Sequence, residues 1–243
     1  MIVSIILENS GVLIKIAAIA DLHYSKEINP QPERCGERAV GLLNKALDMI
    51  HNEIKPDILL VAGDLINDAK DLPLLKELAE ILRKVEIPCL IIPGNHDPEP
   101  EIFYQYMPRP ADHLDVNGFR FVSFPYDVET PGWNSYRDPA EIARLEKIGN
   151  ELPTVIFQHV PLFRKGRVGC AYNYDNADEI IARMPEKVVL AVSGHWHFGF
   201  CPSFSLPFAS VAVPSLCEKD FAVSEIELND SGKMTSFTVR YLA

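Results

Sequence analysis

Five short runs of mainly apolar residues recur along the chain, and each has the length of one buried β-strand. Val, Ile, Leu and Ala follow one another in these runs without the alternation that marks a strand with one face in water. The runs occupy residues 12–20, 57–62, 88–93, 154–158 and 188–193. We therefore expect five strands that are covered on both faces, as in a sheet flanked by other layers.

Two segments between the first three runs repeat apolar residues at the three- and four-residue spacing of a helix. They cover residues 34–52 and 74–85. The order strand, helix, strand, helix, strand predicts parallel strands joined by right-handed crossovers. Further expected elements are helices at 139–152 and 176–184, and a proline-rich loop or cap at 98–110.

The remaining predicted strands lie mainly near the C-terminus. Residues 208–213, 221–228 and 235–242 alternate and are separated by turns, so we expect antiparallel pairing, and a further strand at 119–124 follows a turn. Residues 1–7 form either an extra edge strand or a poorly ordered extension, and the role of residues 1–11 stays open. A chain of 243 residues can bury one large core, which predicts a single α/β domain over residues 1–243.

Composition and charge narrow the class of function. The formal net charge of −11 argues against a broad electrostatic grip on nucleic acid. The five cysteines show no Cys-x-x-Cys spacing, which favours reduced thiols over a disulfide framework. No apolar stretch is long enough to span a membrane, and no basic region precedes the apolar N-terminus. We therefore expect a cytoplasmic protein without a membrane partner, and the oligomeric state stays open.

Each of the five apolar runs ends in a short motif of acidic, amide or imidazole side chains. In chain order these are Asp21-Leu22-His23, Gly63-Asp64, Gly94-Asn95-His96-Asp97, His159 and Gly194-His195-Trp196-His197. Ligands of open α/β sheets bind beyond the carboxyl ends of the strands, so five such ends can gather these side chains at one place. Because residues i and i+2 of an extended segment point the same way, we expect Leu22 and Trp196 to face away from that place.

This set of side chains favours a metal site. Taken alone, an Asp-x-His is usually chance, a Gly-Asp is usually a turn and a single histidine usually lies in a core or loop. The motifs hold five of the seven histidines, which indicates a shared function; His51 and His113 are interpreted as ordinary helix and loop residues. Carboxylate, amide and imidazole ligands suit Mn, Fe, Co, Ni or Zn rather than a soft thiolate site.

The order of the motifs resembles that of the calcineurin-like metallophosphoesterase family over roughly residues 12–197. The resemblance implies two packed mixed β-sheets flanked by helices, in a four-layer sandwich, and two divalent metal ions. It places Asp21, His23, Asp64 and His197 on the first metal and Asp64, Asn95, His159 and His195 on the second, with Asp64 bridging. It also makes His96 the acid near the leaving group and Asp97 the partner that orients His96.

The same resemblance implies hydrolysis of a phosphoester by a hydroxide that bridges the two metals and attacks phosphorus. We expect small phosphodiesters, of the cyclic-nucleotide type or related, as substrates. A phosphomonoesterase, a DNA nuclease and a noncatalytic binding module on the same fold are the alternatives. The intact motif histidines argue against the binding module, and the acidic charge argues against the nuclease.

Substrate contacts are the part of the site on which the sequence says least. Around His159 the chain reads Gln-His-Val-Pro, where many members of the resembled family carry a double histidine and a double proline. Residues 98–110 and 126–136, with Trp133, are expected to wall one side. On the other side, a loop could hold a phosphate and stack on a base, or could simply be solvated; its residues are Arg164, Lys165, Arg167, Tyr172, Asn173 and Tyr174.

Overall fold

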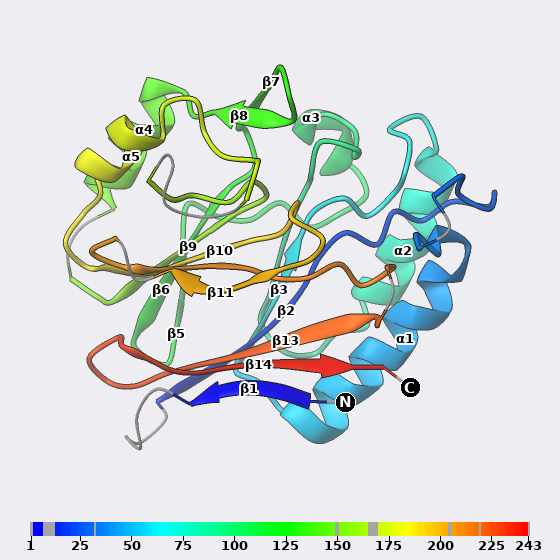
Figure 1. Cartoon of the computed structure of the whole chain (residues 1–243), viewed down its shortest axis with the longest axis horizontal. Helices are drawn as coiled ribbons and strands as arrows, with labels where there is room; N and C mark the ends of the chain where they lie inside the picture. The colour runs from blue at the N-terminus through cyan, green and yellow to red at the C-terminus, as the bar shows by residue number, and fades with distance from the viewer. Residues whose placement is uncertain are drawn as a thin grey trace.

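Two six-stranded β-sheets pack face to face in the computed structural model, and helices cover the outer face of each sheet (Figure 1). The structure describes residues 2–6, 13–31, 33–148, 151–164, 170–203, 206–218 and 220–242. The layers run helix, sheet, sheet, helix, which confirms the predicted fold class. No helix among the described residues is long and apolar enough to cross a lipid bilayer.

The first sheet contains the parallel strands that the first three apolar runs predict. Its strand order is β1 (Ile2–Ile6), β14 (Met234–Tyr241), β13 (Ala222–Leu228), β2 (Ile14–Ile19), β3 (Ile58–Ala62) and β4 (Cys89–Ile92). Strands β2, β3 and β4 are parallel, whereas β13 is antiparallel to both β14 and β2. Strand β1 pairs with β14 at the edge, which confirms the edge-strand interpretation for residues 2–6; residues 7–12 lie outside the described part of the chain.

The second sheet contains two strands that the sequence pattern does not predict, β5 (Leu114–Val116) and β11 (Phe200–Ser203), and one strand, β12 (Ala209–Ala212), whose inner pairing differs from the prediction. Its order is β11, β12, β10 (Val188–Ser193), β9 (Thr154–Gln158), β6 (Phe119–Phe124) and β5. We expected residues 208–213 to pair antiparallel with their neighbours. This holds for β12 and β11, but it is wrong for β12 and β10, which run parallel. The connection between these two strands contains β11 and is long enough for a crossover, so the chain can return in the same direction.

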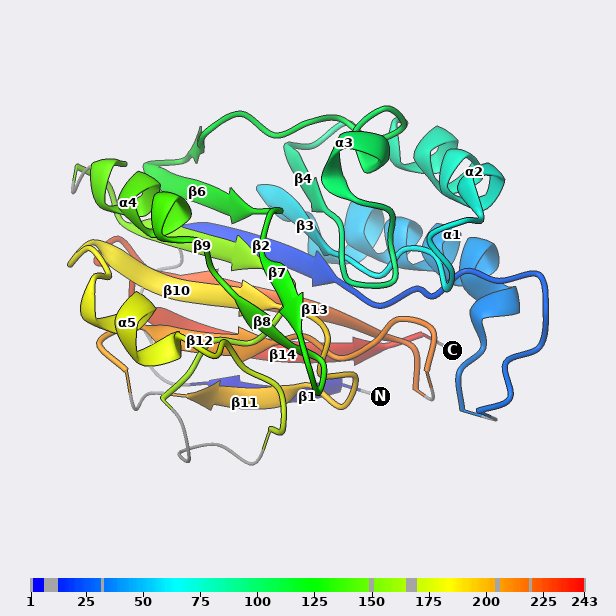
Figure 2. The ribbon, with the colours of Figure 1, turned by 90° about the horizontal axis from the view of Figure 1, so that it is seen from above.

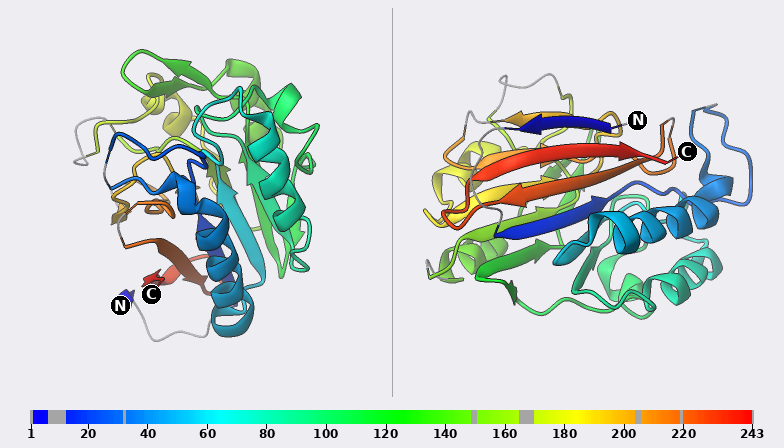
Figure 3. Two further views of the ribbon diagram at one scale, coloured as in Figure 1. Left: turned by 90° about the vertical axis from the view of Figure 1, so that its right-hand side faces the viewer. Right: turned by 90° about the horizontal axis from the view of Figure 1, so that it is seen from below.

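Helices cover the two outer faces of the sheets (Figure 2 and Figure 3). The elements over the first sheet are α1 (Ala39–Met49), α2 (Leu72–Leu82) and α3 (Pro100–Phe103), and those over the second are α4 (Pro139–Lys147) and α5 (Ala177–Ala182). The single helix predicted over residues 34–52 is divided. A 3-10 turn (Gly36–Arg38) precedes α1, and a π-helical turn (Ile50–Ile54) follows it and ends at Lys55 in a left-handed conformation.

The apolar side chains form one cluster at each interface between layers. The central cluster joins the two sheets through side chains such as Ile16, Leu60, Phe121 and Val192. The other two clusters lie between each sheet and its helices. Strands β3 and β9 are buried at every position because both of their faces meet a cluster, which explains why their sequences lack polar alternation.

A short hairpin that the apolar pattern does not predict lies at the top of the molecule in Figure 1. It consists of β7 (Val128–Thr130) and β8 (Asn134–Tyr136), joined by a turn that contains Trp133. The residues of the hairpin are mostly polar and only one of its six strand positions is buried, so hydrophobic patterning carries no signal for it.

Buried Arg137 attaches this hairpin to the second sheet. Its guanidinium donates hydrogen bonds to Asp127 at 2.8 and 2.9 Å, and to Gln158 and Tyr174 at 2.9 Å each. Gln158 is the last residue of β9 and immediately precedes His159. The network therefore fixes the hairpin relative to the strand end that carries a predicted metal ligand.

Replacing Asp127 with Asn should lower the free energy of unfolding by about 3–5 kcal/mol, because it leaves the buried charge of Arg137 without its anion. Urea denaturation followed by circular dichroism measures the change. The matched control is Glu146→Gln, which removes the carboxylate of the exposed pair with Arg183 and should leave stability nearly unchanged. Equal losses in the two variants would contradict the importance of the buried network.

Candidate metal centre

Four side chains converge where the carboxyl ends of β2, β3 and β10 meet. They are Asp21, His23, Asp64 and His197, and one ligand atom from each lies within 4.8 Å of the others. The Nε2 atoms of His23 and His197 are 3.1 Å apart, and Asp21 Oδ1 lies 3.5 Å from His197 Nε2. Donor atoms at these separations can surround a single cation.

A second group of donors lies beside the first and shares Asp64 with it. Ligand atoms of Asp64, His159 and His195 also lie within 4.8 Å of one another. Oδ2 of Asp64 is 3.4 Å from His159 Nε2 and 3.6 Å from His23 Nε2, so one carboxylate oxygen faces both groups. Asn95 contributes an amide oxygen 3.1 Å from His159 Nε2. The structure thus brings the seven predicted ligands to two adjacent positions.

The chemistry of these donors fits a pair of divalent cations. Carboxylate, amide and imidazole groups are the ligands of borderline transition metals. When bound there, two such cations would lower the pKa of a water between them and offset negative charge on a substrate.

The ligands reach these positions through a left-handed backbone. Asp21, His23, Asp64 and His195 have φ angles of 56°, 43°, 53° and 65°, a region that few residues other than Gly adopt. The extended geometry expected for the first motif is therefore wrong, because the chain turns sharply at both of its ligands. Leu22 nevertheless points into the core and is fully buried. Strained conformations of this kind persist where the surrounding packing enforces them.

Trp196 does not face away from the site as alternation predicts. It lines a cleft beside the metal positions, where its ring meets that of Tyr172 edge-on. The reason is the left-handed turn at His195, which removes the two-residue alternation of an extended chain.

Gly94 allows the loops after β3 and β4 to approach each other closely. A Cβ atom at this position would lie 2.3 Å from Asp64 Oδ1 and 2.7 Å from His159 Cε1. No larger residue fits between these two ligands, so the glycine is needed for both to serve one site.

Backbone carbonyls orient two of the ligand histidines from behind. His159 Nδ1 donates to the carbonyl of Ala62 at 2.6 Å, and His195 Nε2 donates to the carbonyl of Trp133 at 2.8 Å. Each bond fixes the tautomer and turns the other ring nitrogen toward the metal positions. The hairpin that carries Trp133 is thus part of the metal centre.

Glu218 orients a third histidine, and the sequence pattern does not reveal it. Its Oε1 accepts a hydrogen bond from His197 Nδ1 at 2.5 Å and another from Arg34 Nε at 3.3 Å. Because Glu218 belongs to no motif and follows none of the five apolar runs, only the tertiary structure places it behind His197. A carboxylate in this position makes a ligand histidine more basic.

Burial and the neighbouring carboxylates together set the protonation of three ligand histidines. Burial lowers the pKa of His23 to about 3, so this ring is neutral, as metal binding requires. Burial also disfavours the charged forms of His159 and His197, but Asp64 and Asp21 outweigh it and raise the two pKa values to about 9 and about 10. Metal binding must therefore displace protons from His159 and His197.

Asp97 does not orient His96, contrary to the role that the family resemblance implies. Its carboxylate accepts the backbone N–H groups of Leu65, Ile66 and Gly94 at 2.9–3.1 Å. Burial raises the pKa of Asp97 to about 7 although these bonds favour its charged form. The side chain points at the backbone because three N–H groups there need an acceptor, and it ties the two ligand-bearing loops together.

A backbone carbonyl orients His96 instead. His96 Nδ1 donates to the carbonyl of Asn67 at 2.9 Å. The ring stacks on Trp133, with centroids 6.2 Å apart and planes 10° apart, and meets His23 edge-on at 4.7 Å. His96 therefore lies beside the metal positions, and neither group of ligand atoms found among the described residues includes it.

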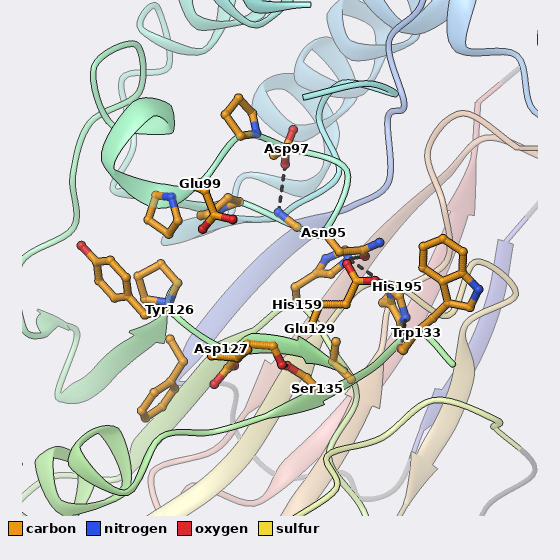
Figure 4. Close-up of a pocket in the computed structure, with 18 of the residues that line it drawn as sticks. Asn95, Asp97, Glu99, Tyr126, Asp127, Glu129, Trp133, Ser135, His159 and His195 are labelled. Carbon is orange, nitrogen blue, oxygen red and sulfur yellow. Dashed lines mark hydrogen bonds between the residues drawn. The ribbon is translucent and has the colours of Figure 1, made fainter. Parts of the chain in front are cut away.

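Two hollows of different character meet at the second metal position. The smaller, of about 250 Å³, includes the carboxylates of Glu99 and Glu129 in its lining (Figure 4). The larger is a cleft of about 810 Å³. Asn95, Trp133 and His195 line both of them. A substrate bound at the metals can thus extend in two directions.

The loop before α5, at residues 164–174, contributes fewer side chains to the site than its composition suggests. Arg164 is exposed, and Lys165 and Arg167 lie outside the described residues. Tyr172 lines the larger cleft. Neither of the two alternatives left open for this loop applies to Asn173 and Tyr174, because both are buried and hydrogen-bond to Phe163 and Asp127 within the fold.

Replacing Glu218 with Gln should weaken metal binding at the first position about 10- to 100-fold, since His197 loses the carboxylate that orients it. Competition with a chromogenic chelator measures the affinity. Glu33→Gln is the matched control, because Glu33 is an exposed carboxylate of the same cleft. Identical affinities in the two variants would refute the orienting role of Glu218.

Comparison with known proteins places these features in one family. The family model of the calcineurin-like phosphoesterases matches residues 14–199. A Coxiella burnetii protein named "probable cyclic nucleotide phosphodiesterase" is 27% identical over 234 residues, which cover 87% of this chain and 89% of that protein. A serine/threonine-protein phosphatase of Bos taurus is 28% identical over 211 residues, which cover 76% of this chain and 65% of that protein.

Solved structures share the fold. A dimetal phosphatase from Danio rerio superposes with a TM-score of 0.69 at 15% identity, over 96% of this chain and 100% of that one. A purple acid phosphatase from Lupinus luteus superposes with a TM-score of 0.57 at 14% identity, over 95% of this chain and 54% of that one. Because the family model spans most of the chain and all seven ligand positions, the protein belongs to the calcineurin-like phosphoesterase family.

Proposed function

We propose that this protein hydrolyses small phosphodiesters, with cyclic nucleotides as the preferred subclass. The observation that carries the proposal is the pair of hollows that meet at the metal positions. The two ester groups of an acyclic diester can each enter one hollow while the phosphate stays at the metals. In a cyclic nucleotide one ribose carries both ester oxygens, and its base can extend into one of the hollows. The name of the Coxiella burnetii relative supports the same subclass.

The charge of the smaller hollow argues against polynucleotide substrates. Glu99, Glu101 and Glu129 line it and are exposed. In DNA, the phosphates next to the scissile one would approach these carboxylates, and like charges repel each other. Together with the net charge of −11, this lining favours a small diester over a nucleic acid.

We assign the role of proton donor in this reaction to His96. It lies in the larger cleft, outside both groups of ligand atoms among the described residues. Water gives up one proton to solvent as its oxygen bonds to phosphorus, the bond from phosphorus to the departing oxygen breaks, and that oxygen takes the Nε2 proton of the protonated His96 ring. The carbonyl of Asn67 holds the imidazole in place for this transfer.

A phosphomonoesterase is the second candidate function. The Bos taurus relative is named a serine/threonine-protein phosphatase, and the larger cleft, at about 810 Å³, can accommodate a bulky substituent. The two candidates differ in how many ester bonds the phosphorus carries, so matched substrates separate them.

The Mn-loaded protein should hydrolyse bis(p-nitrophenyl) phosphate and cyclic nucleotides with a higher kcat/KM than p-nitrophenyl phosphate, and should degrade single-stranded DNA slowly. Nitrophenolate release and chromatography of the products measure these rates. Asp64→Ala, which lacks the shared carboxylate, controls for contaminating hydrolases. A higher kcat/KM for the monoester would refute the diesterase proposal in favour of a phosphomonoesterase. Degradation of DNA faster than that of any small diester would refute it in favour of a nuclease.

His96→Ala should lower kcat about 10²- to 10⁴-fold for diesters with alcohol leaving groups, the usual contribution of a general acid. The loss should be much smaller with nitrophenolate, which leaves without protonation. Elemental analysis should show unchanged metal content, and His113→Ala, at an exposed histidine outside the motifs, serves as the control. Loss of metal, or an equal defect with both leaving groups, would assign His96 another role.

A further inference from the structure

Aromatic side chains wall the larger cleft. Trp133, Tyr172, Trp196 and Phe198 line it, from the turn between β7 and β8, the loop before α5 and the loop after β10. The same cleft is lined by metal ligands, namely Asp64, Asn95, His195 and His197. An aromatic surface is therefore continuous with the position where a phosphate would bind.

Three of these rings form a row that starts at the metal centre. The ring of Tyr172 contacts the ligand His195, with centroids 4.7 Å apart. Tyr172 and Trp196 meet edge-on with ring centroids 5.6 Å apart, and Trp196 and Phe198 also meet edge-on, at 5.3 Å. The row thus leads from a metal ligand outward to Phe198.

Two of the rings that line the cleft are largely exposed to solvent. Phe198 is 77% exposed and Trp133 is 52% exposed. Exposed apolar surface next to a polar site is a common mark of ligand binding. Covering these rings with a flat ligand would remove their apolar area from water.

We propose that the row of Tyr172, Trp196 and Phe198 binds a planar aromatic substituent of the substrate, such as a nucleobase. The inference rests on the proposed function, because it takes the phosphate to be held at the adjoining metal centre. Stacking of a base on an aromatic side chain corresponds to about a 5- to 150-fold gain in affinity. Gln31 and Glu33 line the same cleft and supply polar contacts for the edge of the ring.

The smaller hollow is the other place where such a ring could bind. Its lining includes the carboxylates of Glu99 and Glu129, and Tyr126 lies across the hollow from the ligand histidines (Figure 4). Of the two hollows at the metal positions, Tyr126 lines the smaller and not the larger, so it provides an aromatic control at the same metal centre.

Tryptophan fluorescence can report occupation of the cleft, because the chain contains two tryptophans and both line it. A non-hydrolysable adenosine phosphonate should quench the fluorescence of the metal-loaded protein. Its Kd should be about 5- to 150-fold lower than that of the matching ribose phosphonate without a base. In Trp133→Phe, the remaining Trp196 should still report the quenching. Equal Kd values for the two phosphonates would overturn the proposal.

Variants of the row test the same preference in turnover. Trp196→Leu should raise KM for cyclic adenosine monophosphate, but not for a base-free cyclic ribose phosphate, whereas Trp196→Phe should retain the preference. Phe198→Ala should also weaken the preference for the substrate with a base. This variant provides the test if Trp196→Leu loses metal. Tyr126→Ala should keep the ratio between the two substrates. Loss of the ratio in Tyr126→Ala alone would place the base in the smaller hollow and overturn the proposal.

Turnover of bis(p-nitrophenyl) phosphate separates failure of the inference from failure of the proposed function. If the wild-type protein cleaves this diester but shows no preference for a base, the aromatic row has no binding role and the diesterase stands. If no diester is cleaved, the proposed diesterase activity is refuted. Equal affinity for the two phosphonates would then also refute the proposed aromatic binding site.

Discussion

The buried carboxylate of Asp64 is the group on which the rest of the site depends. One of its oxygens faces both His23 and His159, and the other accepts the backbone N–H of His96 at 2.8 Å. Burial opposes ionisation of Asp64, but the neighbouring imidazoles outweigh it and hold its pKa well below the usual range. A charge at this depth is stable only among groups that compensate for its lost hydration, so the ligands must be positioned as a set.

The packing of the two sheets supplies that positioning. Asp64 follows a strand of the first sheet and His159 follows a strand of the second, so the interface between the sheets sets the separation of the two metal positions. Gly94 lets the loops approach, and Asp97 ties them through backbone hydrogen bonds. Left-handed conformations at the ligands cost of order 1–3 kcal/mol each, and this packing enforces them.

The surroundings of the metal positions give the two arms of a diester different environments. The smaller hollow is acidic and the larger cleft is aromatic. Trp133 lines both hollows. Its carbonyl orients His195, and its ring stacks on His96. The hairpin that carries Trp133 is held by the buried network of Arg137, so His195, His96 and the lining of both hollows share one structural support.

The main strands and the candidate metal ligands can be recognised from the chain alone, because both signals are local: an apolar run is followed directly by an acidic, amide or imidazole side chain. Strands β9 and β10 even have their predicted bounds. The tertiary structure sets the contacts of Asp97, which is hydrogen-bonded to Leu65 across 32 positions of the chain, and of Glu218, which is hydrogen-bonded to His197 across 21. It also decided the direction of β12 and the left-handed turns at the ligands. These features depend on contacts between distant segments, and periodicity along a chain describes only neighbours.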